Sequence, residues 1–243
     1  MLVLKKEMNK INNIQIYTKT GTFHLNNNTE NQDVVMHAEN DEYEIISLAD
    51  GVSSCKNGKE GANIACKTVT DIFLSCGHIF LDYPREKTAY LVLSEIAGNI
   101  SAAARKSGET AESYSSTICF ACIEKETGRM LSFQLGDSNL YLLSETGCRT
   151  MSSNKNRKPV FTTYKDADEQ ALVNIYDIKK LNGVMLCSDG AWQLLHNKSI
   201  FEPNLLKTIQ RGDFSPLEKF FENKDNVDDC SYILVDFKDR KIA

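Results

Sequence analysis

The sequence has few prolines and few glycines, 4 and 13 among 243 residues, and it has no low-complexity tract. Linkers between domains are usually rich in proline, glycine or polar residues, so no linker is indicated. A hydrophobic fraction of 42% is enough for a sizeable core at this length. We therefore expect one domain over residues 1–243, with its core at about 14–237.

An excess of basic residues is also missing, because 28 Lys and Arg face 33 Asp and Glu, for a net charge of −5. A nucleic-acid backbone is bound by clustered cations, so nucleic acid is not expected as a partner. No apolar run approaches the roughly 20 residues that span a bilayer, and the first ten residues lack a long apolar signal segment. These observations predict a cytoplasmic chain with no membrane partner.

Disulfides are not expected, although the sequence contains 8 cysteines. Most of them lie inside apolar runs, which is typical of reduced core cysteines. The C-x-x-C pair, Cys119 and Cys122, lies in an alternating run, where the two thiols would point to opposite faces of a strand. A shared metal or a redox pair is therefore not indicated, and no cysteine lies in the phosphate-cradling loop that a cysteine phosphatase needs.

The apolar patterns that are present predict a mixture of strands and helices. The strands are expected at 14–20, 33–38, 42–49, 117–124, 129–135, 139–144, 183–188 and 232–237. Helical spacing covers 59–75 and 86–106, with shorter helices near 204–210 and 216–221. The polar stretches 26–32 and 152–168 are expected to be surface segments.

The most informative stretch is the apolar run that ends on Asp50 and Gly51. A carboxylate at the mouth of a buried strand is costly unless a cation or donor pairs with it. Glycine would allow the backbone carbonyl to approach the same partner. This combination suggests a hard metal ion bound through oxygen.

Other aspartates also occur at strand ends: Asp189 follows a strand, Asp228 precedes the last one and Asp137 lies in a turn. A single aspartate in such a place is usually a turn former or a helix cap. Several carboxylates that converge at one end of a sheet repel each other unless divalent cations neutralise them. Oxygen ligands alone favour Mg²⁺ or Mn²⁺ over zinc.

The ordered motifs resemble those of the metal-dependent (PPM, type 2C) serine/threonine protein phosphatases, bacterial-type branch. The matching motifs are Asn31-Gln32-Asp33, Ala49-Asp50-Gly51-Val52, Gly58 to Ala62, Gly136-Asp137-Ser138, Ser188 to Trp192 and Asp228-Asp229-Cys230-Ser231. Each motif is weak alone, but their order over about 14–237 is specific. The resemblance implies an α+β fold, a four-layer αββα sandwich of two antiparallel sheets flanked by helices.

The resemblance also implies a centre of two Mn²⁺ or Mg²⁺ ions. By this resemblance, Asp50 would bridge the two ions, and the Gly51 carbonyl would bind one of them. Asp189 and Asp228 would hold the other ion. Asp33 would contact the centre directly or through water, and Asp137 would bind a third, weaker ion. Asp225-Asn226 is a rival for the last motif, and Asp228 is preferred for its spacing to Ser231.

The implied reaction is hydrolysis of phosphoserine or phosphothreonine in a phosphorylated protein substrate. A hydroxide formed from a water that bridges the two ions would attack the phosphorus in line, with Asp50 and Asp189 acting through that water. The resemblance further suggests a serine/threonine kinase as a partner.

Two function classes stay open because the chain departs from the family pattern. The arginine expected five residues before Asp33 to grip the substrate phosphate is replaced by Asn28, and an amide cannot make its bidentate contact. The phosphate contact is thus unassigned, with Lys19 and Lys56 as substitutes. The first class is an active phosphatase. The second is a pseudophosphatase that acts as a binding or regulatory module.

Overall fold

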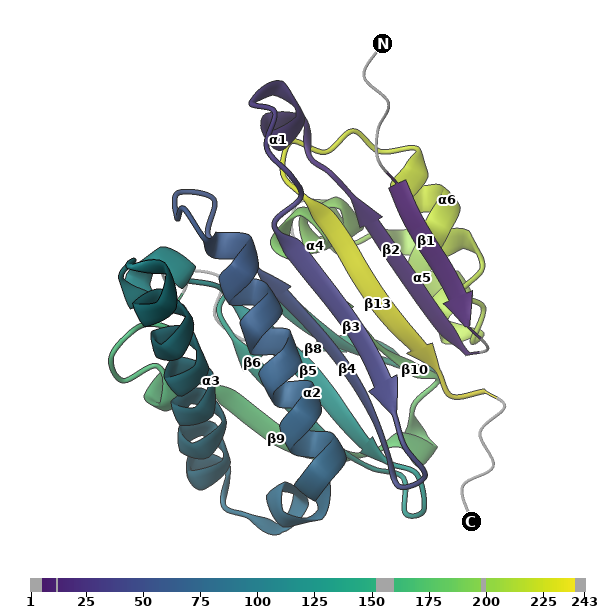
Figure 1. Cartoon of the computed structure of the whole chain (residues 1–243). Coiled ribbons are helices and arrows are strands. Elements are labelled where there is room, and N and C mark those ends of the chain that lie inside the picture. The colour runs from purple at the N-terminus through teal and green to yellow at the C-terminus, as the bar shows by residue number, and fades with distance from the viewer. Residues whose placement is uncertain (1–5, 12, 152–159, 198–199, 239–243) are drawn as a thin grey trace.

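The computed structural model describes residues 6–11, 13–151, 160–197 and 200–238. Two antiparallel sheets pack face to face, and helices cover the outer faces (Figure 1). The predicted four-layer αββα sandwich is confirmed.

The two sheets contain five and six strands. In spatial order, the five-stranded sheet consists of β3 (Asp33–Glu39), β4 (Tyr43–Asp50), β5 (Ile118–Glu124), β6 (Arg129–Leu135) and β9 (Leu172–Asp177). The six-stranded sheet consists of β1 (Lys6–Ile11), β2 (Ile14–Lys19), β13 (Cys230–Asp236), β10 (Gly183–Cys187), β7 (Asn139–Ser144) and β8 (Gly147–Thr150). A short ribbon, β11 (His196–Asn197) with β12 (Ile200–Phe201), lies outside both sheets.

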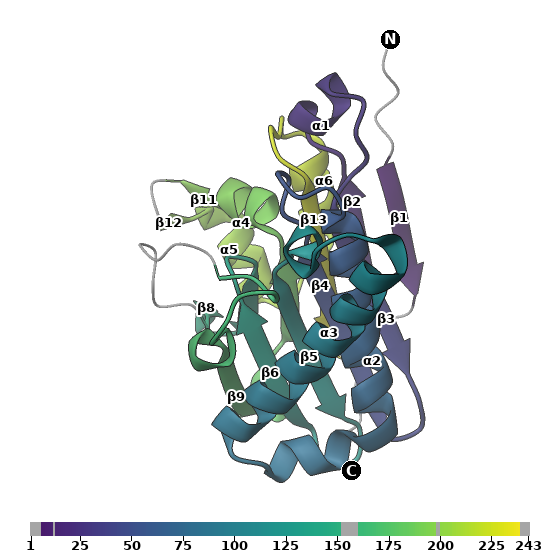
Figure 2. The same cartoon turned by 60° about the vertical axis from the view of Figure 1, so that its left-hand side comes forward.

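The helices form the two outer layers (Figure 2). The five-stranded sheet is covered by α2 (Gly58–Asp82) and α3 (Arg85–Ser107), and the six-stranded sheet by α4 (Asp189–Leu195), α5 (Pro203–Gln210) and α6 (Pro216–Glu222). The short helix α1 (Thr22–Asn26) lies beyond one end of the sandwich (Figure 1).

Alternation along the strands separates three apolar layers. In β13, Tyr232 and Leu234 pack toward the outer helices, whereas Ile233 and Val235 pack between the two sheets. Because successive side chains in a strand point to opposite faces, one strand can serve two cores at once. The strands at the centre of the sandwich are therefore buried on both faces.

The same alternation settles the prediction for the C-x-x-C pair. Cys119 lies in the apolar cluster between the sheets, whereas Cys122 lies in the cluster under α2 and α3. The two thiols thus point to opposite faces of β5, as predicted. All 8 cysteines of the sequence are free thiols.

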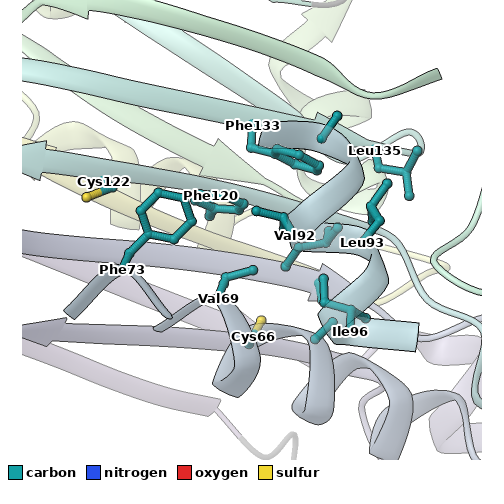
Figure 3. Packing of buried hydrophobic residues seen from close by; sticks show 14 of the residues in the cluster. Cys66, Val69, Phe73, Val92, Leu93, Ile96, Phe120, Cys122, Phe133 and Leu135 are labelled. Carbon is teal, nitrogen blue, oxygen red and sulfur yellow. The ribbon is translucent and has the colours of Figure 1, made fainter. Parts of the chain in front are cut away.

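The core under α2 and α3 is built around stacked aromatic rings (Figure 3). The ring of Phe120 stacks on that of Phe133 with 5.0 Å between centroids, and Phe73 of α2 lies 4.9 Å from Phe120. Residues of α2 at spacings of three and four, including Cys66 and Val69, complete this face. Helical structure continues seven residues beyond the predicted end, across a kink at Cys76, and Phe80 and Leu81 pack into the same core as Phe73.

The composition of α2 differs from the expectation that no apolar run is long enough to span a bilayer. An 18-residue window of this helix has a mean hydropathy of 1.4, so that among the described helices it has the length and composition of a span. However, 44% of that window is buried inside the protein, and α2 packs against β4 and α3. A core helix meets the same criteria, which accounts for its apolar character.

Several short elements were not predicted. The helices α1 and α4 and the strands β1, β8, β9, β11 and β12 fall in stretches that the sequence patterns left without an assignment. The predicted surface stretch 152–168 lies partly outside the described residues. In its described part, Thr162 and Ala167 are buried, so that this part is not all surface.

Candidate metal centre

Strand ends from both sheets meet at one end of the sandwich. Asp33, the first residue of β3, pairs in register with Asp50, the last residue of β4. In the other sheet β10 and β13 are antiparallel neighbours, so Asp189, just after β10, lies beside the chain that enters β13. This is the end at which α1 and α4 lie (Figure 1). The fold thus brings together carboxylates that are up to about 200 positions apart in the sequence.

Glycines at these ends allow backbone segments to approach closely. A Cβ atom on Gly51 would lie 2.3 Å from the carbonyl carbon of Gly58 at the start of α2. A Cβ atom on Gly190 would lie 2.1 Å from the carbonyl oxygen of Asp229. Neither distance is compatible with a side chain, so glycine is required at both positions.

Two buried serines fix Asp189 relative to the chain before β13. The backbone N–H of Ser188 donates to the Ser231 carbonyl over 3.0 Å, and the N–H of Ser231 donates to the Ser188 hydroxyl over 2.9 Å. Both serines are fully buried. Because Asp189 follows Ser188 directly, these bonds fix the backbone position from which the Asp189 side chain projects.

The turn that carries Asp137 connects β6 to β7 and is attached to α4. The indole N–H of Trp192 donates to the backbone carbonyl of Asp137 over 2.8 Å. Trp192 is therefore an anchor between α4 and this turn, and its ring also lies edge-on to that of His196.

The carboxylates are arranged at a high electrostatic cost. Burial raises the pKa of Asp33 to about 8, and the neighbouring charge of Asp229 adds to the shift. Burial and the charge of Asp228 raise the pKa of Asp189 to about 7. Burial raises the pKa of Asp50 well above its usual value, with further contributions from Asp33 and then Asp189. Such a group of like charges is stable in ionised form only when cations neutralise it.

A sequence profile described as Protein phosphatase 2C matches residues 20–220. The match covers most of the chain and includes Asp33, Asp50, Asp137 and Asp189. The chain belongs to the protein phosphatase 2C family. It is therefore a protein-serine/threonine phosphatase of the hydrolase class, and the resemblance inferred from the ordered motifs is confirmed.

Solved structures share the fold of this phosphatase at low sequence identity. The serine/threonine phosphatase Stp1 from Staphylococcus aureus is 16% identical, with a TM-score of 0.68 over 97% of this chain and 99% of that chain. The Mycobacterium tuberculosis serine/threonine phosphatase PstP/Ppp is 14% identical, with a TM-score of 0.63 over 92% of this chain and 97% of that chain. A structure of RsbX in complex with magnesium is 16% identical, with a TM-score of 0.60 over 95% and 98%. No curated protein matches the chain.

The donor set of the phosphatase fits hard divalent cations. Within the described residues, both carboxylate oxygens of Asp33 and Oδ1 of Asp189 are buried without a hydrogen bond of standard geometry, although the nearby hydroxyls of Ser231 and Ser188 lower the pKa of Asp33. Buried carboxylate oxygens without donors are costly, and Mn²⁺ and Mg²⁺ take oxygen ligands. No three described His, Cys, Asp or Glu side chains are gathered in the geometry of a metal site. The ligand roles assigned to individual residues, including the Gly51 carbonyl, therefore stay predictions.

The structure distinguishes the two rivals for the last motif. Asp225 is exposed, whereas Asp228 is half-buried next to β13. The charge of Asp228 contributes to the raised pKa values of Asp50, Asp137 and Asp189, and Asp225 does not appear among the causes. Burial and these charge effects thus favour Asp228 over Asp225.

Asp229 has a role that the sequence did not reveal. Its carboxylate is buried and accepts hydrogen bonds from the backbone N–H groups of Gly21, over 2.8 Å, and Gln32, over 2.6 Å. Its Oδ2 atom also lies 2.9 Å from Nδ1 of the buried His24. One side chain thus joins α1, the chain before β3 and the chain before β13. No sequence signal marks this role, because the partners are about 200 residues away.

The cations proposed to replace the missing arginine are engaged elsewhere. The ammonium of Lys19 donates to the backbone carbonyl of Lys224 over 2.8 Å, and Lys56 is paired with Glu109. Asn28 itself is exposed on a backbone with φ of +53°. In the described structure, the ammonium groups of both lysines are thus bound at sites other than the aspartates, and neither is shown at a place for the substrate phosphate.

A third lysine, Lys59, lies beside the start of β3 and was not proposed from the sequence. Its ammonium donates to the carbonyl of Asn31, two residues before Asp33, and lies 3.3 Å from the carboxylate of Glu30. Its backbone nitrogen would be 2.7 Å from a Cβ atom on Gly51. Lys59 thus spans from the end of β4 to the start of β3.

The raised pKa of Asp33 leads to a pH-dependent prediction for the metal-free phosphatase. The folded state holds this proton more tightly than the unfolded state, so ionisation costs stability as pH rises from 3.8 to about 8. Asp33→Asn removes that cost. We expect the melting temperature of Asp33→Asn in EDTA, relative to the wild type, to increase by on the order of 5 °C from pH 5 to pH 8.

Thermal denaturation monitored by circular dichroism at several pH values measures this difference. Asp71→Asn, at an exposed site on α2, is the matched control and should show a difference that does not change with pH. A constant difference for Asp33→Asn as well would contradict the prediction.

Proposed function

We propose that this phosphatase hydrolyses phosphoserine and phosphothreonine in proteins at a centre of two Mn²⁺ or Mg²⁺ ions. The observation that supports this most is the set of buried carboxylates at one end of the sandwich, whose raised pKa values and unpartnered oxygens are those expected of a cation site without its cations. Bound there, the ions would lower the pKa of a water and offset the charge of the phosphoryl oxygens.

The residues proposed to hold the ions come from both sheets. Asp50 and the Gly51 carbonyl lie at the end of β4, and Asp33 lies opposite Asp50 at the start of β3. From the second sheet, Asp189 begins α4 and Asp228 precedes β13. Because each residue lies at the end of a regular element, the scaffold holds the carboxylates rigidly. Asp137, on the turn held by Trp192, is proposed for a third and weaker ion.

The pseudophosphatase alternative is not favoured. A module that needs only the fold gains nothing from keeping several like charges buried together, since each of them costs stability. The loss of arginine at Asn28 concerns the substrate phosphate and leaves the carboxylates unchanged. The magnesium complex of the structurally similar RsbX supports a cation in this fold.

The proposed substrate is a phosphorylated protein, and a serine/threonine kinase is proposed as a partner on the family resemblance alone. For the phosphate group, Lys59 is our proposed contact, because its ammonium lies at the Asn31 carbonyl, two residues before Asp33, whereas Lys19 and Lys56 bind Lys224 and Glu109. An ammonium offers a point charge and not the planar fork of a guanidinium.

The proposal is tested by the metal dependence of hydrolysis. We expect Mn²⁺ to support hydrolysis of p-nitrophenyl phosphate and of phosphoserine and phosphothreonine peptides, and EDTA to reduce the rate by roughly 10²-fold or more, because the proposed nucleophile is a water activated by the ions. Released phosphate is the readout, and a phosphotyrosine peptide of the same sequence tests selectivity. Full activity in EDTA would contradict the proposal.

A further inference from the structure

Thr117, just before β5, is hydrogen-bonded to both backbone groups of Asp50. Its Oγ1 accepts a hydrogen bond from the Asp50 N–H over 2.9 Å, and its own N–H donates to the Asp50 carbonyl over 2.9 Å. The residue is 1% exposed, so water cannot replace these bonds. Thr117 therefore fixes the backbone from which the Asp50 carboxylate projects.

The same hydroxyl also contacts the turn that carries Asp137. Oγ1 of Thr117 lies 2.8 Å from Oγ of Ser138, which is fully buried. A hydroxyl has one donor and two acceptor sites, so it can serve Asp50 and Ser138 at the same time. The Thr117 methyl, Cγ2, would lie 2.6 Å from a Cβ atom on Gly136. One side chain thus contacts both residues that flank Asp137.

We infer that Thr117 is a positioning residue that sets the distance between Asp50 and Asp137. This inference rests on the proposed function, since the two carboxylates matter together only if cations bind between them. Thr117 contacts no substrate and acts through the backbone of its neighbours. Partners of this kind around a metal site typically contribute 10- to 100-fold to metal affinity or activity.

The hydroxyl and the methyl can be separated by substitution. Thr117→Val keeps the shape and the methyl contact with Gly136 but removes both hydroxyl bonds. Thr117→Ser keeps the hydroxyl and removes the methyl. Positioning through the hydroxyl predicts that the valine variant loses metal affinity and that the serine variant retains it.

Mn²⁺ binding measured by isothermal titration calorimetry and electron paramagnetic resonance is the readout. We expect Thr117→Val to weaken the weakest detected Mn²⁺ site by about 10- to 100-fold, and Thr117→Ser to stay within about threefold of the wild type. Thr88→Val is the control, because Thr88 is fully buried in α3 and its hydroxyl has no hydrogen-bond partner among the described residues.

Ser138→Ala tests the same link from its other side and keeps the inference testable if the valine variant does not fold. It should weaken Mn²⁺ binding as well, and the double variant should bind no more weakly than Thr117→Val alone, because both changes break one link. Equal Mn²⁺ binding by wild type, Thr117→Val and Ser138→Ala would overturn the inference and leave the proposed function standing. Absence of Mn²⁺ binding by the wild type would overturn both.

Discussion

Asp50→Asn is expected to reduce phosphatase activity by roughly 10³-fold or more while it stabilises the metal-free protein. The charge of Asp50 is opposed by its surroundings, since burial and the neighbouring charge of Asp33 raise its pKa well above the usual value. If Asp50 holds the cations as proposed, a neutral amide would be a weaker ligand than the carboxylate, so binding of the ions should fail. The same change removes a repelling charge, so the melting temperature in EDTA should rise.

The fold should persist in this variant, because the bonds between Asp50 and Thr117 involve the backbone of Asp50 and not its carboxylate. Activity on p-nitrophenyl phosphate, Mn²⁺ calorimetry and thermal denaturation together check the prediction. Asp41→Asn is the matched control, an exposed aspartate near the opposite end of β4, and it should match the wild type in all three. Retained Mn²⁺ binding by Asp50→Asn would contradict the role proposed for Asp50.

Asp229→Ala is expected to cause the largest loss of stability of any single carboxylate substitution at this end of the sandwich. The change leaves the N–H groups of Gly21 and Gln32 buried without an acceptor. Each orphaned buried donor costs about 1–3 kcal/mol, so a loss of about 3–5 kcal/mol is expected in total. For a chain of this length that corresponds to a fall of about 10 °C in melting temperature.

Denaturant unfolding followed by fluorescence measures the loss. Asp225→Ala, four residues earlier and exposed, removes the same group from the same segment and should change stability by less than about 0.5 kcal/mol. If the two variants were equally stable, the hydrogen bonds that Asp229 accepts would contribute nothing to the free energy of unfolding. Asp229→Asn keeps one acceptor oxygen and is expected to fall between alanine and the wild type.

The sequence predicted the parts of the site that depend on local patterns. The apolar run before Asp50 identified β4, and the alternation around Cys119 identified β5, because strands buried in a sandwich have strong local signals. The helix α4 was missed, since it is short and begins with Asp189 and Gly190, residues that favour turns.

The long-range contacts could not be predicted from the sequence. The bonds from Asp229 to Gly21 and from Thr117 to Asp50 join residues 208 and 67 positions apart, and no periodicity records such pairs. The positions of the lysines were missed for the same reason. In the sequence, Lys59 is only a residue in the first turn of a helix. Its contact with the Asn31 carbonyl depends on how α2 packs against the start of β3.

The position of β13 affects how this protein folds while the ribosome synthesises it. β13 lies between β2 and β10, so the two halves of the six-stranded sheet cannot join until residues 230–236 have been synthesised. Until then β2 and β10 each present an unpaired strand edge, and such edges favour aggregation. Asp228 reaches the other carboxylates only at that late stage. Nascent chains that end before β13 should therefore depend on chaperones, and they lack the proposed cation ligand Asp228 beside Asp50 and Asp189, so that phosphatase activity is expected only after β13 has joined the sheet.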